Sequence, residues 1–205
     1  MICKKHKFVF ICVPKTGSTS ISNALKEYCI DLSPRKKHLT YSEYLNLNRR
    51  HEKVNKDYFF FAFVRNPFDR LVSQFRFTGK RWWRWAGFQE ESLCFENYVK
   101  QIVAYDLPFS SHLYNSKIQS KSKHDKDWSQ LQFLSENLDF IGRFENLQND
   151  FNIVCDKIGI PHQQLQHKNK THHKHYTEYY DDETRSIVAE KYAKDIEYFG
   201  YKFGE

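Results

Sequence analysis

The residues best suited to chemistry form a short loop near the start of the chain, Pro14-Lys15-Thr16-Gly17-Ser18-Thr19-Ser20. The loop joins an apolar strand to the first turn of a helix, where unpaired backbone N–H groups and a partial positive charge favour an anion. Gly17 permits close approach of the backbone, and Lys15 adds a mobile positive charge. The hydroxyl residues after Gly17 add further donors. The loop therefore predicts a site for a phosphate or a sulfate group.

The order of lysine and glycine separates this loop from the loop of nucleoside triphosphatases. That motif needs a glycine, four further residues, and then Gly-Lys followed by Ser or Thr. Here Lys15 precedes Gly17, which is the only glycine of the loop. The triphosphatase motif is absent, but the loop alone leaves open both a small-molecule kinase of another type and an ordinary strand-to-helix turn.

A second polar segment follows a second apolar strand, Tyr58–Val64. Arg65 stands at the carboxyl end of that strand, and Ser73 lies two turns into the following helix, which Asn66 can cap. In a parallel sheet this strand end can lie beside the first loop, and a guanidinium and a hydroxyl there can bind a second phosphate. The alternative is structural: Arg65 pairs with an acidic residue of the helix, and Ser73 is solvated.

Taken together, the two segments resemble the paired nucleotide-binding motifs of carbohydrate sulfotransferases, a broad family that includes heparan sulfate 2-O-sulfotransferases and many bacterial members. The similarity extends to Asp139–Glu145 and to the closing stretch Asp195–Phe203. The resemblance implies 3′-phosphoadenosine 5′-phosphosulfate as the donor, adenosine 3′,5′-bisphosphate as the product, and no required metal. It places the 5′-phosphosulfate on Lys15–Ser20 and the 3′-phosphate on Arg65 and Ser73.

Sulfuryl transfer of this kind is a loose in-line substitution that gains most from positioning and charge stabilisation. Lys15 is our candidate for the electrostatic role. A histidine, whose ordinary pKa is near 6.5, suits the removal of the acceptor's hydroxyl proton. Of the ten histidines we favour His38, which lies between the two motifs, where the resembling enzymes place their base. His112 is the alternative, as base or as an acceptor ligand, and a merely solvated His38 also stays open.

The late segment 168–176 concentrates positive charge and polar donors. Related sulfotransferases close a loop at this position over the nucleotide, which implies a contact with the 3′-phosphate for Lys170, Thr171 or Lys174. The histidines of this segment lack a carboxylate or cysteine to complete a set of ligands, so we predict no metal site.

Two further groups are candidates for binding the acceptor. The run Lys80-Arg81-Trp82-Trp83-Arg84-Trp85 interleaves cations with indoles, which stack on sugar rings while arginines pair with acidic groups. Burial of two of the three tryptophans in a core is the competing explanation. Arg143 follows a third strand and can reach the same cleft, or it can form a structural ion pair with Glu145.

Three apolar runs alternate with helical patterns along the chain. The runs are 8–13, 58–64 and 139–144, and the helical patterns are 18–28, 67–77, 147–158 and 182–194. This alternation predicts an α/β, P-loop-like three-layer fold with a mostly parallel central sheet and helices on both faces. We expect one domain over residues 1–205, in which the less regular stretch 79–128 is mostly helical and forms a wall of the acceptor cleft.

Composition narrows the class of protein further. The chain has 205 residues and a formal net charge of +7, which favours anionic partners. Its five cysteines are scattered and its apolar runs are far shorter than a membrane span, so we expect a reduced, cytoplasmic protein without a transmembrane segment. The expected partners are the nucleotide and a hydroxyl-bearing acceptor, a sugar or polysaccharide. A basic module that binds nucleic acid is the weaker alternative, because it leaves both phosphate motifs unexplained, and the oligomeric state stays open.

Overall fold

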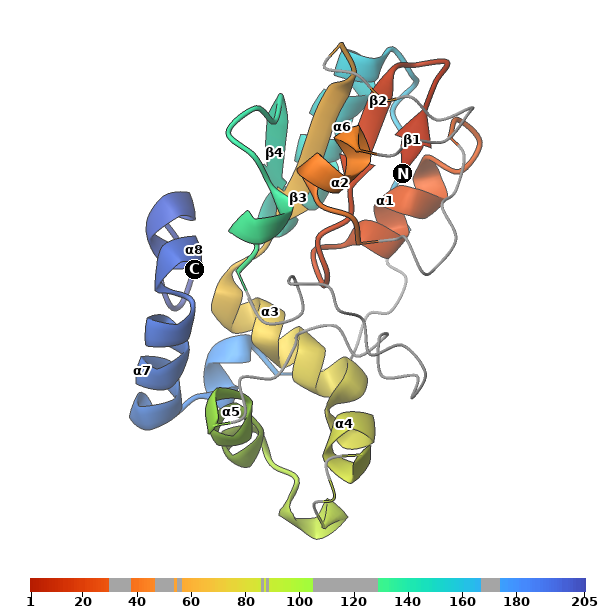
Figure 1. Ribbon diagram of the computed structural model, residues 1–205. Helices are drawn as coiled ribbons and strands as arrows, with labels where there is room; N and C mark the ends of the chain where they lie inside the picture. The colour runs from red at the N-terminus through yellow and green to blue at the C-terminus, as the bar shows by residue number, and fades with distance from the viewer. Residues whose placement is uncertain are drawn as a thin grey trace. The chain divides into compact units, whose positions relative to one another are not determined.

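The computed structural model of the chain (Figure 1) describes residues 1–29, 38–46, 54, 57–85, 87, 89–104, 129–166 and 174–205. The chain forms two compact units. The first unit comprises Met1–Arg65 and Gln130–Lys170, and the second comprises Asn66–Ser129 and Thr171–Glu205. The expectation of one domain over the whole chain stays a prediction.

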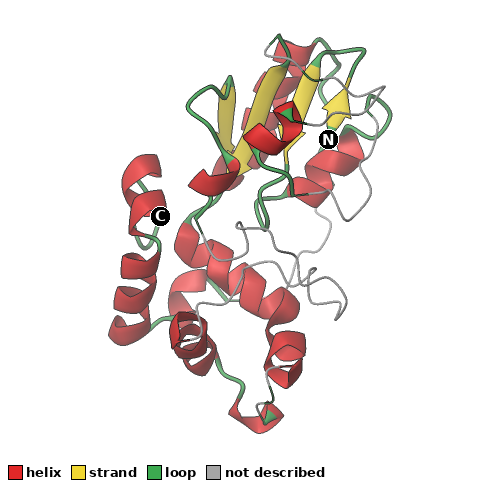
Figure 2. Ribbon diagram, in the orientation of Figure 1, coloured by secondary structure: helices red, strands yellow, loops and turns green. Residues whose placement is uncertain are grey.

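The first unit is built on a sheet of four strands in the order β1-β2-β3-β4 (Figure 2), and their bounds are β1 Ile2–Cys3, β2 Phe8–Ile11, β3 Phe59–Val64 and β4 Phe140–Arg143. The last three strands run parallel, and only β1 is antiparallel to its neighbour. The carboxyl ends of β2, β3 and β4 therefore meet at one edge of the sheet.

Apolar side chains on both faces explain why β2 and β3 read as continuous hydrophobic runs. On one face, Phe61 and Phe63 pack with residues of two helices, α1 (Ser18–Ala24) and α6 (Leu147–Ile158). On the other face, the alternate strand residues pack against α2 (Tyr41–Leu45) and the 3₁₀ turn at 131–133. The predicted α/β class, with a mostly parallel sheet covered on both faces, is confirmed.

One glycine marks how tightly the first face is packed. Gly142 on β4 pairs with Phe63 on β3, and the Phe63 ring occupies the space that a Cβ at Gly142 would need. A methyl group at this position would displace a buried aromatic ring. The strand β4 is therefore specified by a small residue as well as by its apolar neighbours.

The second unit is helical. Its elements are α3 (Pro67–Gln74), a π-helical turn (Phe75–Gly79), α4 (Lys80–Trp85), α5 (Phe95–Ala104), a 3₁₀ turn (Tyr176–Tyr179), α7 (Asp182–Lys191) and α8 (Ala193–Phe199). Aromatic residues dominate its core. A buried ion pair crosses this core, in which Arg70 Nη1 lies 4.0 Å from Asp195 Oδ2 and the Ser129 hydroxyl donates to Asp195 Oδ1 over 2.5 Å.

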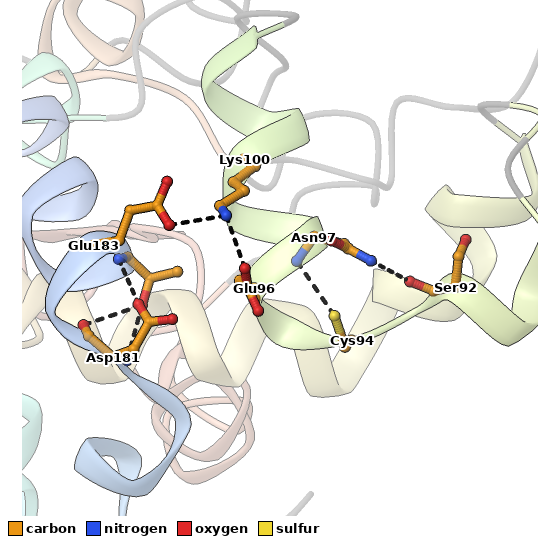
Figure 3. Close-up of polar contacts among 8 residues, drawn as sticks. Ser92, Cys94, Glu96, Asn97, Lys100, Asp181 and Glu183 are labelled. Carbon is orange, nitrogen blue, oxygen red and sulfur yellow. Dashed lines mark hydrogen bonds and ion pairs between the residues drawn. The ribbon is translucent and has the colours of Figure 1, made fainter.

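The surface of the second unit carries a polar network that links α5 to α7 (Figure 3). Lys100 Nζ lies 2.7 Å from a carboxylate oxygen of Glu96 and 2.9 Å from one of Glu183. The hydrogen bonds to Glu96 and then Glu183 raise the pKa of the Lys100 ammonium. All three side chains are exposed, in contrast to the buried pair in the core.

Several boundaries differ from those expected from sequence. The strand β2 ends at Ile11 rather than at residue 13, and α1 ends at Ala24 rather than at residue 28. The helix that begins at Pro67 does not stop near residue 77, because the π-helical turn carries it into α4. The last predicted helix is two helices, since the backbone of Tyr192 leaves helical geometry between α7 and α8. The helix at 147–158 begins and ends as predicted.

The stretch 79–128 is helical through Ala104 apart from the turn between α4 and α5, and residues 105–128 lie outside the described residues. In the described part of the chain, every helix is too short or too polar to cross a membrane.

Candidate functional site

The phosphate loop predicted from sequence connects the carboxyl end of β2 to the first turn of α1. The Thr16 hydroxyl is fully buried and donates to the carbonyl oxygen of Val13 over 3.0 Å, which closes the loop on itself. The backbone N–H of Ser20 donates to the carbonyl oxygen of Gly17, also over 3.0 Å. These two bonds give the loop a defined shape from its own sequence, with Thr16 acting as a structural residue.

Two residues of this loop, Lys15 and Gly17, have left-handed backbone. Lys15 has φ of 67° and Gly17 has φ of 81°. The value at Gly17 costs little, but for a lysine this conformation costs about 1–2 kcal/mol. Strain of this kind persists where the surrounding structure holds it, and it clusters at ligand-binding sites.

The amide groups at the start of α1 suit an anion. No side chain caps this helix, and within the described part of the chain the backbone N–H groups of Ser18 and Thr19 have no acceptor. The side chains of Ser18 and Ser20 are largely buried in the loop, and Lys15 and Thr19 are partly exposed beside them. The loop therefore has the donors that a phosphate or sulfate group needs.

Arg65 lies at the same edge of the sheet, directly after β3, and Gln130 fixes its backbone. The Gln130 side chain accepts from the Arg65 backbone N–H and donates to the Arg65 carbonyl oxygen, each over 2.9 Å. Gln130 itself is fully buried. Its amide thus continues the hydrogen bonding of β3 by one residue, as a neighbouring strand would.

The guanidinium of Arg65 reaches the phosphate loop. Its Nη1 donates to the carbonyl oxygen of Lys15 over 3.4 Å, and its Cζ lies 4.0 Å from the centroid of the Phe144 ring. Arg65 is 7% exposed, so the charge is held almost out of water. The structure brings Arg65 together with the loop that carries Lys15 and the hydroxyl residues, and the roles predicted for these residues in binding a ligand stay predictions.

His38 lies at the start of the same loop. Its Nδ1 is 2.7 Å from the carbonyl oxygen of Cys12, two residues before Pro14. A carbonyl oxygen only accepts hydrogen bonds, so Nδ1 carries the proton and the neutral ring has its lone pair on Nε2. Thr40 and Glu43 form a capping box that starts α2 immediately after His38. The imidazole is therefore oriented as a proton acceptor by the backbone beside the loop.

The other predicted residues are distributed differently. Ser73 lies on α3 and is partly buried, and Arg84 is exposed at the end of α4. Arg143 is an exposed side chain at the end of β4, whose backbone N–H donates to Asp150 Oδ2 over 2.6 Å. Lys174 is exposed and pairs with Glu178 at 3.6 Å.

His112, Lys170 and Thr171 lie outside the described residues, as do the side chains of Arg81 and Trp82.

The tryptophan-rich run divides between core and surface. Trp83 is 2% exposed, and its Nε1 donates to the carbonyl oxygen of Gln89 over 2.7 Å. Lys80 instead pairs with Glu90 at the surface. Trp83 therefore packs in the core of the second unit, as the alternative to acceptor binding expects for two of the three tryptophans.

Among the described residues, no group of three or more His, Cys, Asp or Glu side chains is arranged to hold a metal ion.

Sequence reasoning missed two residues that shape the site, Gln130 and Phe144. Gln130 belongs to no segment singled out from the sequence, Phe144 lies within Asp139–Glu145 but has no predicted role there, and the roles of both depend on which strands are neighbours. For Phe144 a signal existed in principle, because it is the last residue of the predicted run 139–144, whose end lies at the same edge of a parallel sheet as Arg65.

The sequence of the chain matches a known protein family along almost its whole length. Residues 1–202 match the sequence pattern described as the sulfotransferase family. The chain is 27% identical over 216 residues to human carbohydrate sulfotransferase 9, an alignment that covers 94% of this chain and 47% of that protein. The chain thus spans about half the length of this curated relative. A solved sulfotransferase from Alicyclobacillus acidocaldarius aligns over 96% of both chains with 14% identity and a TM-score of 0.39.

Proposed function

Because this chain belongs to the sulfotransferase family, we propose that it transfers the sulfuryl group of 3′-phosphoadenosine 5′-phosphosulfate to a hydroxyl of a carbohydrate, with His38 as the general base. The observation that carries the proposal is the 2.7 Å contact between His38 Nδ1 and the Cys12 carbonyl oxygen at the start of the phosphate loop. The name of the human relative, carbohydrate sulfotransferase 9, supports a carbohydrate as the acceptor.

The residues around the loop fit the donor. Backbone N–H groups of Ser18 and Thr19 and the charge of Lys15 would hold the 5′-phosphosulfate, and the buried guanidinium of Arg65 would hold the 3′-phosphate. When bound, the donor supplies the sulfuryl group and the phosphate that leaves. Lys15 provides positive charge where negative charge collects during transfer.

His38 acts on the acceptor. Its Nε2 accepts the proton of the acceptor hydroxyl as that oxygen becomes a nucleophile, and the ring becomes an imidazolium. The Nδ1–H bond to Cys12 O keeps the ring in the required tautomer and stabilises the positive charge as it forms. The same backbone segment therefore positions the proton acceptor and begins the loop that holds the donor.

Ligand binding separates this function from its alternatives. Adenosine 3′,5′-bisphosphate at about 100 times its Kd is expected to stabilise the protein by about 2.7 kcal/mol, which a thermal shift detects. The parallel samples contain ATP with Mg²⁺, for the kinase alternative, and single-stranded DNA, for the nucleic-acid alternative. Stabilisation by either of these without any effect of the bisphosphate would refute the proposal.

Substitution of His38 tests the catalytic role. Transfer from the donor to a panel of sugars and sulfatable polysaccharides is expected to fall about 10²- to 10⁴-fold in His38→Ala, because the general base is lost. Binding of adenosine 3′,5′-bisphosphate is expected to stay near the wild-type value. The control is His162→Ala in the same unit, since His162 is exposed and pairs with Asp156 at 2.8 Å. Wild-type turnover by His38→Ala would remove His38 as the base.

A further inference from the structure

We propose that Phe144 is a positioning residue that couples the two halves of the donor site, the phosphate loop and the arginine that binds the 3′-phosphate. The inference rests on the proposed function, and it concerns a residue that lies outside both the phosphate loop 14–20 and the segment 65–73. Phe144 begins the short 3₁₀ turn Phe144–Asn146, which leads from β4 into α6.

Sheet register explains why this ring lies beside Arg65. Val64, the last residue of β3, is the Cα partner of Arg143, the last residue of the parallel strand β4. The next residue of each strand is then Arg65 and Phe144, at the same edge of the sheet. Parallel pairing of the two strands thus delivers a cation and an aromatic ring to adjacent positions.

The ring sets the direction of the Arg65 side chain. Gln130 holds the Arg65 backbone on both sides, so the backbone is fixed independently of the guanidinium. The guanidinium donates a long hydrogen bond of 3.4 Å to the Lys15 carbonyl oxygen, and its Cζ lies 4.0 Å from the centroid of the Phe144 ring. A cation this close to a ring face and largely out of water gains a substantial cation–π attraction.

The same ring supports the phosphate loop. An atom placed at the Cβ position of Gly17 would lie 3.3 Å from Phe144 Cδ2 and 3.0 Å from Leu147 Cδ2, so these side chains form the floor beneath the loop glycine. Phe144 therefore contacts the backbone that holds one phosphate and the guanidinium that holds the other. It fixes the spacing between the two anion sites.

This role predicts an effect that depends on the ligand. Adenosine 3′,5′-bisphosphate requires both anion sites at the correct spacing, whereas adenosine 5′-phosphate requires only the loop. Phe144→Leu keeps an aliphatic group against Gly17 and Leu147 but removes the aromatic face under Arg65. The affinity for the bisphosphate is expected to fall about three- to thirtyfold, and the affinity for the monophosphate less than about twofold.

The experiment is isothermal titration of both nucleotides into the full chain. Phe144→Tyr is expected to keep the wild-type ratio of the two affinities, because the aromatic ring is retained. Phe144→Met is a second variant without the ring, with the same expectation as Phe144→Leu and a more adaptable side chain. Phe140→Leu is the control: Phe140 is a partly buried ring on β4 that packs edge-on against Phe63.

A double-mutant cycle separates positioning from general packing. If Phe144 acts through Arg65, then Phe144→Leu has no further effect on bisphosphate affinity in an Arg65→Ala background. An unchanged affinity ratio in the folded ring-less variants, or equal effects with and without Arg65, would overturn the inference alone. A wild-type protein that binds the two nucleotides equally would instead count against the proposed donor site as a whole.

Discussion

Replacing Gly17 with alanine tests the geometry of the phosphate loop directly. Two independent costs are expected from the structure. The left-handed φ of 81° costs an L-residue about 1–2 kcal/mol. The new Cβ would also lie 3.0 Å and 3.3 Å from the two methyl carbons of Leu147 and 3.3 Å from Phe144 Cδ2, inside ordinary carbon–carbon contact distances, and overpacking of this kind costs about 1–3 kcal/mol.

The total expected loss is therefore about 2–5 kcal/mol of unfolding free energy. For a chain of this size each kcal/mol lowers Tm by about 2–4 °C, so the shift is about 4–20 °C. Urea unfolding followed by circular dichroism gives the free energy by linear extrapolation. We also expect weaker binding of adenosine 3′,5′-bisphosphate, because relief of the contact requires the loop to move away from α6.

Gly159 provides a matched control in the same unit. It has φ of 68° at the end of α6, and a Cβ there would meet nothing within 4 Å. Gly159→Ala therefore carries the backbone cost without the steric cost and is expected to lose about 1–2 kcal/mol with unchanged nucleotide binding.

Two results would refute this reasoning. The first is an equal loss of stability in Gly17→Ala and Gly159→Ala, which would mean that the contact with Leu147 and Phe144 has no cost. The second concerns the double variant Gly17→Ala with Leu147→Ala, in which the shortened side chain makes room for the new methyl group. Its destabilisation is expected to be less than the sum of the two single effects, and strict additivity would contradict the predicted clash.

Further predictions concern the second unit. Asp195→Ala removes the carboxylate that pairs with buried Arg70, and it is expected to lower the free energy of unfolding in urea by about 3–5 kcal/mol. Glu183→Ala in the exposed network is expected to leave that free energy unchanged within error. Comparable losses in the two variants would contradict the expectation that the buried pair matters more than the exposed one. Hydrogen bonds from the Thr184 hydroxyl and then the Thr184 N–H lower the pKa of Asp181 below its ordinary value of 3.8. The stability that Asp181 adds is therefore complete above about pH 4 and lost as the pH falls through the lowered pKa. When Tm is measured as a function of pH, the difference in Tm between the wild type and Asp181→Asn is expected to shrink below pH 4. A difference that grows below pH 4 would contradict a lowered pKa of Asp181 in the folded protein.

The parts of the fold that sequence predicted are those with strong local signals. The strands β2 and β3 are buried on both faces and so appear as uninterrupted apolar runs. The helix α6 is bounded at its end by Gly159 in left-handed geometry, and α3 begins with an asparagine cap and a proline at its first position, as its sequence predicts. Each of these features depends on neighbours in the chain.

The parts that sequence did not predict depend on tertiary contacts. The strand β1 is two residues long, so it has no periodic pattern, and it exists because it pairs with β2. The short helix α2 is specified by its capping box and by two buried tyrosines rather than by its length.

The site divides in the same way. The phosphate loop and Arg65 follow from composition and strand order, and the structure places them together. The prediction of His38 rests on resembling enzymes, which have a base between the two motifs, and its contact with the Cys12 carbonyl oxygen does not follow from spacing. The contribution of Gln130 requires the chain to return to the end of β3 after a long separation in sequence, which no local pattern encodes.

Gln130 has a consequence for how the chain tolerates change. Its side-chain amide binds both the backbone N–H and the carbonyl oxygen of Arg65. The chain leaves the first unit after Arg65 and re-enters it at Gln130, so the last residue before the stretch 66–129 is hydrogen-bonded to the first residue after it. The two residues that flank the stretch 66–129 are thus held next to each other. Because the Gln130 amide joins the two ends of this stretch, a change of length within it is expected to leave the end of β3 in place. We therefore expect the stretch 66–129 to tolerate changes of length while Lys15 and Arg65 keep their spacing at the sheet edge.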